Sequence, residues 1–167
     1  PGGALAGRQR PAAILDPLLG TPLADLLADP ARLAARTDLA QPIQFALQAA
    51  LLAAYTEVGV VPDLVLGHSL GEFAAAHAAG VMDLATGLTL TAARGKAMQR
   101  AAEQARDAGA PTGMLAVGLD AAEVELSLPP GLVLAADNGP RAAVVAGPLD
   151  WLDAFRASLP PEIFSEP

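Results

Sequence analysis

The chain has 167 residues, of which 53% are hydrophobic, 4% aromatic and 17% charged, and its formal net charge is −8. This length suits one domain, or one domain with a small appendage, and the composition allows a large core of Ala, Leu and Val. The acidic balance argues against nucleic acid as a partner, and no run of residues is apolar enough to cross a membrane. Because the chain has no cysteine and no visible signal peptide, we expect a cytoplasmic protein without a metal site.

Helices are predicted along most of the first hundred residues. Apolar residues recur at helical spacing from Gln41 to Val58, and Gly59 suits the C-terminal cap of that helix. Prolines interrupt the residues before it, where only short helical turns are expected. In chain order, the predicted elements are helical turns at 12–19 and 22–28 broken by Pro17, Pro22 and Pro30, helices at 41–58, 71–79 and 84–108, and a buried strand at 64–66.

The predicted pattern changes after residue 111 to strand, helix, strand, strand and helix. Asp120 suits the N-terminal cap of the first of these helices. The order is most of a split βαβ unit, whose closing strand is missing or only begun at 162–165. The strands are expected at 113–119, 132–136 and 142–146, and the helices at 121–128 and 148–158. We therefore predict an α/β chain with a first subdomain at 1–111 and a truncated second one at 112–167.

A short motif after the predicted strand 64–66 suggests catalysis. Residues 67–71 read Gly-His-Ser-Leu-Gly, the Gly-x-Ser-x-Gly pattern of a nucleophile elbow. A turn this tight is expected to need glycine on both flanks of Ser69 and to expose its hydroxyl group. The first amides of the following helix lack partners within the helix, so they can bind an oxyanion. The same pentapeptide also occurs by chance in unrelated proteins, which leaves an ordinary serine as the alternative.

A nucleophilic serine needs a base, and the sequence offers two histidines. His68 adjoins Ser69, but neighbouring side chains that leave a strand point to opposite sides. His77 lies eight residues further along a helix, at roughly 12 Å from Ser69, and is expected to be an ordinary helix residue. A hydrolase with a Ser-Asp/Glu-His triad needs a histidine late in the chain, and none follows His77.

Five motifs in the same order and spacing resemble the acyltransferase domain of modular type I polyketide synthases and the related malonyl-CoA:acyl-carrier-protein transacylases. The resemblance covers nearly the whole chain and is far more specific than the pentapeptide. The motifs are Gln41-Pro42-Ile43-Gln44-Phe45-Ala46, Gly67-His68-Ser69-Leu70-Gly71-Glu72-Phe73-Ala74-Ala75, Ala92-Ala93-Arg94-Gly95-Lys96-Ala97-Met98-Gln99, Asp137-Asn138-Gly139-Pro140 and Val144-Val145-Ala146-Gly147.

The resemblance implies a fold and a set of site residues. The fold is a hydrolase-like, parallel-sheet subdomain with the nucleophile elbow, here 1–111, and a ferredoxin-like subdomain, here the truncated 112–167. By resemblance, Ser69 carries the acyl group as an ester and the backbone amide of Leu70 is half of the oxyanion hole. Arg94 holds the free carboxylate of a malonyl-type group, since a guanidinium matches a carboxylate with two parallel hydrogen bonds. The other substrate-binding residues that it implies are His68, Gln41 and Asn138.

The implied reaction moves a malonyl-type extender from coenzyme A to the phosphopantetheine thiol of an acyl carrier protein, with no bound cofactor. The partners would be the acyl-CoA, the carrier protein and neighbouring synthase domains. Three features of the family are absent: an N-terminal Gly-Gln-Gly segment, a late catalytic histidine and the glutamine that supports it. We therefore expect a fragment of the domain that is inactive by itself.

Two other functions remain open at this stage. One is an α/β-hydrolase esterase, against which the missing late histidine counts, as does Arg94, because a simple ester offers it no carboxylate. The other is a degenerate module that only docks an acyl carrier protein, against which the intact elbow and Arg94 argue. Within the acyltransferase reading, Leu70 favours malonyl over methylmalonyl, because a branched aliphatic residue usually follows the serine in malonyl-type domains.

Overall fold

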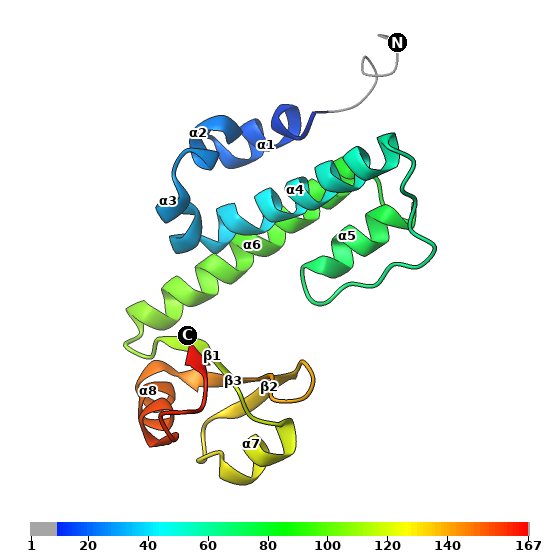
Figure 1. The fold of residues 1–167 in the computed structure, drawn as a ribbon. Helices are drawn as coiled ribbons and strands as arrows, with labels where there is room; N and C mark the ends of the chain where they lie inside the picture. Colours follow the sequence, from blue (N-terminus) through cyan, green and yellow to red (C-terminus); the bar gives the residue numbers. More distant parts are fainter. Residues whose placement is uncertain (1–9, 167) are drawn as a thin grey trace. The chain divides into compact units, whose positions relative to one another are not determined.

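The computed structural model describes residues 10–166 (Figure 1). The chain divides into two compact units, Pro1–Arg100 and Ala101–Pro167, called below the N-terminal and the C-terminal unit. No helix in the described part is long and apolar enough to span a bilayer. The elements are α1 (Pro11–Leu19), α2 (Leu23–Leu27), α3 (Pro30–Ala35), α4 (Thr37–Glu57), α5 (Gly71–Ala78), α6 (Leu84–Asp107), β1 (Thr112–Val117), α7 (Ala121–Ser127), β2 (Val133–Asp137), β3 (Ala143–Pro148), α8 (Leu149–Ser158) and β4 (Ser165–Glu166).

The N-terminal unit is more helical than the sequence predicted. Pro17 lies inside α1 instead of ending it, because one proline removes a single amide donor from the helix. Pro30 begins α3, where the Asp29 side chain accepts a hydrogen bond from the Arg32 amide at 3.0 Å. Helix α4 starts four residues before the predicted start at Gln41, since the Arg36 carbonyl already accepts the Ala40 amide.

The predicted helix ends are confirmed at two glycines with left-handed backbone. Gly59 has φ +84° and donates to the Thr56 carbonyl, while the next amide reaches back to Tyr55. Gly80 has φ +73° and closes α5 in the same way. Both ends are Schellman motifs, which need a residue without Cβ strain at this position.

Two glycines of α6 allow it to lie close to α4 (Figure 1). A Cβ at Gly87 would fall 2.2 Å from the Phe45 ring, and one at Gly95 would fall 2.9 Å from the Cα of Asp38. The main hydrophobic cluster of this unit comes from α1, α2, α4 and α6; its buried members are Leu15, Leu26, Leu39, Ile43, Phe45, Ala46 and Leu88. This close packing holds the first turns of α4 against the middle of α6.

The predicted buried strand at 64–66 is wrong for the part of the chain that the structure describes. These residues form no strand, and Leu64 and Leu66 are 78% and 82% exposed. A strand needs the amides and carbonyls of a neighbouring strand, and every described ladder lies within residues 112–166. The apolar run instead precedes the turn as an exposed segment without a described strand partner.

The C-terminal unit contains a four-stranded sheet in the order β2-β3-β1-β4. All of its neighbouring strands are antiparallel, with Leu115 opposite Val145 on β1 and β3. The element order predicted from the sequence is confirmed, with ends that differ by one or two residues. The closing strand is present as β4, whose two residues pair with Ala116 and Val117. Because β3 separates β1 from β2, the strand order is that of a split βαβ unit.

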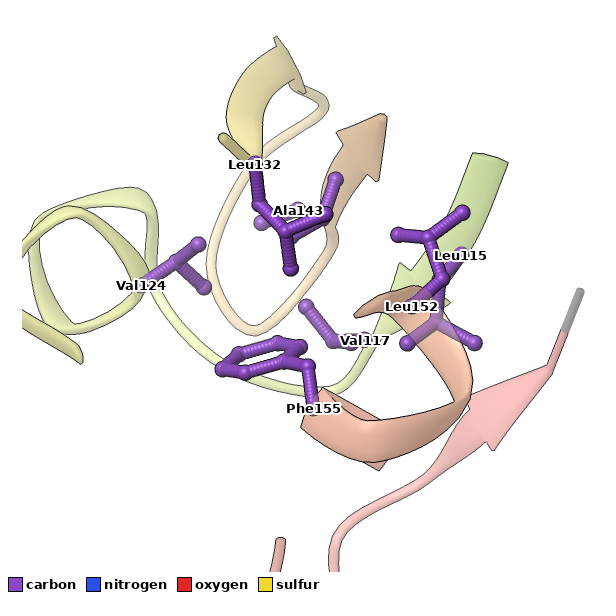
Figure 2. Close-up of a cluster of buried hydrophobic side chains, with 8 residues drawn as sticks. Leu115, Val117, Val124, Leu132, Ala143, Leu152 and Phe155 are labelled. Atoms are coloured by element: carbon purple, nitrogen blue, oxygen red, sulfur yellow. The ribbon is translucent and has the colours of Figure 1, made fainter. Parts of the chain in front are cut away.

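The core of the C-terminal unit lies between one face of the sheet and the helices α7 and α8. Figure 2 shows side chains from β1, α7 and α8 converging on this space, among them Val117, Val124 and Phe155. The buried members of this cluster are Leu115, Val117, Val124, Leu132, Ala143, Val145, Leu152 and Phe155. Alternate residues of β1 and β3 point inward, as expected for strands with one buried face.

Candidate active site

Ser69 sits on a strained turn between the extended segment 64–66 and helix α5. Its φ is +54°, a left-handed conformation that non-glycine residues rarely adopt. A Cβ on Gly67 would lie 2.2 Å from the Gly71 carbonyl oxygen, whereas a Cβ on Gly71 would meet nothing within 4 Å. The expected need for glycine on both flanks therefore holds only for Gly67. The turn leaves the Ser69 side chain exposed, as a nucleophile elbow requires.

The backbone amides that follow Ser69 are mostly occupied. The Gly71 amide donates to the His68 carbonyl at 2.9 Å, and the Glu72 amide donates to the Ser69 carbonyl at 3.1 Å. As expected, these two amides have no partner within α5, but carbonyl groups that precede the helix occupy them, so neither is open to an oxyanion. Among the described residues, no backbone oxygen accepts the Leu70 amide. Leu70 thus offers a backbone donor next to the serine hydroxyl that an oxyanion could use.

Arg94 on α6 reaches the serine from another part of the chain. Its Nη2 lies 3.3 Å from the Ser69 Oγ, at the long end of hydrogen-bond distances. Its Nη1 donates to the Oε1 of Gln41, which is buried on α4. The structure therefore brings together three residues that the sequence analysis singled out: Ser69, Arg94 and Gln41. A partly buried cation beside the hydroxyl can bind a carboxylate on an acyl group that the serine carries.

His68 faces away from this cluster. It lines a cavity of about 550 Å³ between α4, residues 64–68 and α5, and neither Ser69 nor Arg94 lines that cavity. The Gln48 Oε1 in the wall of the same cavity is buried without a hydrogen-bond partner. The placement agrees with the expectation that neighbouring side chains at the elbow diverge.

His77 has a structural role, as expected. Its Nδ1 lies 2.9 Å from the Met82 carbonyl oxygen, and its ring packs edge-on against Phe45 with centroids 5.9 Å apart. The first contact holds the end of α5 to the segment that leads into α6, and the second packs it against α4. In the described residues neither histidine is hydrogen-bonded to Ser69, so none of them acts as its base in this arrangement.

Asn138 belongs to the C-terminal unit, in the turn between β2 and β3. Its amide donates to the Ala142 carbonyl at 2.9 Å, and its side chain is exposed. In the same turn, Arg141 has φ +56°, and its amide donates to the Asp120 Oδ1 at 2.8 Å. Asp120 also starts α7, where its own amide donates to Glu123 at 3.1 Å, which confirms the predicted cap.

One contact of the cluster was not predicted. The Nε2 of Gln41 lies 2.9 Å from the Sδ of Met98, which is on α6. Met98 stands four residues after Arg94, and residues at this spacing share one face of a helix. That spacing could have identified Met98 as a neighbour of the guanidinium, whereas its contact with α4 depends on how the two helices pack.

Two carboxyl groups near these helices have shifted acidity. The hydrogen bonds from Arg36 lower the pKa of Asp38, which lies in the first turn of α4. The hydrogen bond from the Thr86 amide lowers the pKa of Asp83, whose carboxylate caps the start of α6. No group of three His, Cys, Asp or Glu side chains that could hold a metal ion occurs within residues 10–166.

Comparison with known proteins identifies the family. The family described as "Acyl transferase domain" matches residues 7–163. The polyketide synthase GfsB of Streptomyces halstedii is 40% identical over 142 residues, which cover 80% of this chain and 2% of that protein. The PKS-NRPS hybrid synthetase ATPKS of Aspergillus niger is 40% identical over 141 residues, covering 84% of this chain and 8% of that protein.

Solved structures give the same result. A malonyl CoA-acyl carrier protein transacylase from Burkholderia pseudomallei matches with a TM-score of 0.80 and 30% identity, over 93% of this chain and 53% of that one. The acyltransferase domain of an iterative polyketide synthase in enediyne biosynthesis matches with a TM-score of 0.66 and 41% identity, over 78% of this chain and 34% of that one. This chain therefore spans about half of the transacylase and much less of the synthases.

The chain belongs to the acyl transferase domain family. Its relatives within that family are polyketide synthase proteins and a malonyl CoA-acyl carrier protein transacylase, as the sequence motifs indicated.

Proposed function

We propose that this chain is part of an acyltransferase that moves a malonyl-type group from coenzyme A to an acyl carrier protein by way of Ser69. One observation carries the proposal: the guanidinium of Arg94 lies 3.3 Å from the hydroxyl of a serine on a strained elbow. A nucleophile and a carboxylate-binding cation at this separation fit an acyl group with a free carboxylate.

The proposed reaction has two steps, acylation of Ser69 and transfer of the acyl group to the carrier protein. The Ser69 oxygen attacks the thioester carbonyl while a base removes its proton, and the coenzyme A thiol leaves with a proton to give the acyl ester. The phosphopantetheine thiol of the carrier protein then attacks that ester, and the serine regains its proton. The Leu70 amide stabilises the oxyanion of both tetrahedral intermediates. The protein needs no cofactor of its own for this chemistry.

The base is proposed to come from outside this chain. His77 is engaged with Met82, and His68 lines a cavity that excludes Ser69. General-base help contributes about 10²–10⁴-fold to such a step. The 167-residue chain alone is therefore expected to transfer acyl groups very slowly, compared with a polypeptide that holds the whole domain.

The acyl group is proposed to be malonyl. Arg94 would hold its free carboxylate, and Leu70 would form a wall of the pocket that disfavours the extra methyl group of methylmalonyl. Such a wall is worth only about 1–3 kcal/mol, so the preference over methylmalonyl is modest. Gln41 is proposed to contribute to substrate binding through its hydrogen bond with Arg94. For His68 and Asn138, a role in substrate binding is proposed from the family resemblance alone.

The proposal also includes the fold of the two subdomains. Residues 1–111 would belong to a hydrolase-like subdomain with a parallel sheet. Residues 112–167 would be a ferredoxin-like subdomain, which the antiparallel order β2-β3-β1-β4 supports. A protein with neighbouring synthase domains as partners would act in the cytoplasm.

Mass spectrometry of the acyl-enzyme tests the proposed function. A polypeptide that carries this chain within a whole acyltransferase domain is mixed with labelled malonyl-CoA, quenched and digested. The label is expected on Ser69 and absent from the Ser69→Ala variant. Label retained in Ser69→Ala would contradict the proposal, and a wild type that takes no label while it still binds a carrier protein would favour the docking module.

A further inference from the structure

Gln41 does not present a free amide to a substrate. It is only 7% exposed, and both ends of its carboxamide are engaged: Oε1 accepts from Arg94, and Nε2 lies 2.9 Å from the Sδ of Met98. A side chain held at both ends within a helix interface acts on a substrate through its neighbours. The neighbour that can touch a substrate is Arg94, which also reaches Ser69.

The chemistry of the two partners fixes which way the amide of Gln41 points. A guanidinium has only donors, so it must face the amide oxygen, whereas a thioether sulfur has no hydrogen to donate, so it must face the NH₂ group. A flipped Gln41 would place donor against donor at Arg94. Met98 therefore locks the amide in the orientation that holds the guanidinium.

The packing of α4 on α6 brings Gln41 and Met98 together. The close approach at Gly95 brings the first turn of α4 against α6, and the Thr37 amide donates to the Gln99 Oε1 at 3.1 Å. Contacts at 94, 95, 98 and 99 thus clamp one turn of α6 onto the start of α4. These contacts between the two helices keep the Gln41 side chain within hydrogen-bond distance of the Arg94 guanidinium.

We propose that Gln41, locked by Met98, is a positioning residue that aims the Arg94 guanidinium at Ser69 without neutralising its charge. This inference rests on the proposed function. A carboxylate at position 41 would also orient Arg94, but it would pair with the cation and compete with the carboxylate of the acyl group. A neutral carboxamide uses one N–H of Nη1 and leaves the charge and the remaining donors for the substrate.

A competition experiment tests the proposal in a polypeptide that carries this chain within a whole acyltransferase domain. The enzyme receives equal malonyl-CoA and acetyl-CoA, and intact-protein mass spectrometry gives the ratio of the two Ser69 esters. Only the malonyl ester uses Arg94, so a positioning role changes this ratio while a purely structural role lowers both esters alike. Circular dichroism checks that each variant is folded.

The variants separate orientation from charge. Gln41→Leu is expected to lower the malonyl-to-acetyl ratio about tenfold or more, because the guanidinium loses its anchor. Gln41→Glu is expected to lower it at least as far, since the new carboxylate pairs with Arg94. Met98→Leu should lower it a few fold, because the amide can then rotate. The matched control is Gln44→Leu, an exposed residue of the same helix, which should leave the ratio unchanged.

Three results would overturn the inference: an unchanged ratio in Gln41→Leu, equal losses of both esters in that variant, or a wild-type ratio in Gln41→Glu. A wild-type enzyme that forms no malonyl ester on Ser69 would instead contradict the proposed function. The two failures are therefore distinguishable in one assay.

Discussion

Among the described residues, two that are not glycine have left-handed backbone, Ser69 and Arg141, and they differ in what holds them. In the β2–β3 turn, Arg141 has φ +56°, and its amide is bound by Asp120, which also starts α7. At the elbow, Ser69 has φ +54°, its carbonyl accepts the Glu72 amide, and its side chain contacts Arg94. Strain in the turn is compensated by a bond that builds the fold. Strain at the elbow instead presents a hydroxyl group to a cation, which is the pattern of a functional site.

The largest effect should come from the glycine that makes the elbow possible. Gly67→Ala would place a methyl group 2.2 Å from the Gly71 carbonyl oxygen, and backbone cannot move aside easily. We expect it to destabilise the fold by about 3 kcal/mol. Gly71→Ala is the matched control, because it meets nothing within 4 Å. Urea denaturation of both variants measures the difference, and equal stabilities would mean that the elbow is not built as described.

The β2–β3 turn should depend on Asp120. Asp120→Ala removes the acceptor of the Arg141 amide and half of the capping box of α7. We expect a loss of about 1–2 kcal/mol in the free energy of unfolding. Asp153→Ala, an exposed acid on α8, should change it little. Thermal unfolding measures the stability of both variants. A loss of stability in Asp120→Ala no greater than that in Asp153→Ala would show that Asp120 does not stabilise the turn.

Glycine substitution sharpens the comparison between the two strained residues. Glycine adopts left-handed backbone freely, so Ser69→Gly should be more stable than Ser69→Ala by about 1 kcal/mol. For the same reason, Arg141→Gly should be more stable than Arg141→Ala by a similar amount. Only the Ser69 variants should abolish acylation. Denaturant titrations paired with the acyl-ester assay check both statements, and an alanine at position 69 that is as stable as glycine would show that the elbow is unstrained.

The smallest effect concerns pH and the start of α4. Arg36 lowers the pKa of Asp38, so the ion pair stabilises the folded state above the ordinary carboxyl range near 3.9 and loses this effect as the pH falls below it. The pair is partly exposed, which limits its contribution to about 1 kcal/mol or less. Asp38→Asn should therefore be less stable than the wild type at pH 7 and nearly equal to it at pH 3. A constant difference across that range would contradict the assignment.

The sequence predicted most of the C-terminal unit because its signals are local. Alternating apolar residues, the Asp120 cap and the turn after Asp137 define β1 to α8 within short segments. The helices before the elbow were less well predicted, since Pro17 remains inside α1 and α4 begins at Thr37, four residues before its predicted start. Residues 64–66 were read as a buried strand, but burial depends on partners that a local pattern does not contain.

The site itself could be predicted only in part. The motif gave Ser69, and the family resemblance gave Arg94 and Gln41, which the structure places in contact. The sequence did not predict the contact between Gln41 and Met98 or the cavity that His68 lines, because both depend on how α4 packs against α5 and α6. Asn138 lies in the other unit, so its role remains a prediction.

The most direct test of the central claim is the selectivity of the Arg94→Ala variant for the acyl group. The claim is that this guanidinium beside Ser69 binds the free carboxylate of the acyl group. In a polypeptide with the whole domain, Arg94→Ala should lower the rate of malonyl ester formation on Ser69 about 10–100-fold, and change acetyl ester formation little. Arg100→Ala, an exposed arginine of the same helix, is the matched control and should resemble the wild type. Equal rates of malonyl loading in Arg94→Ala and the wild type would contradict the account.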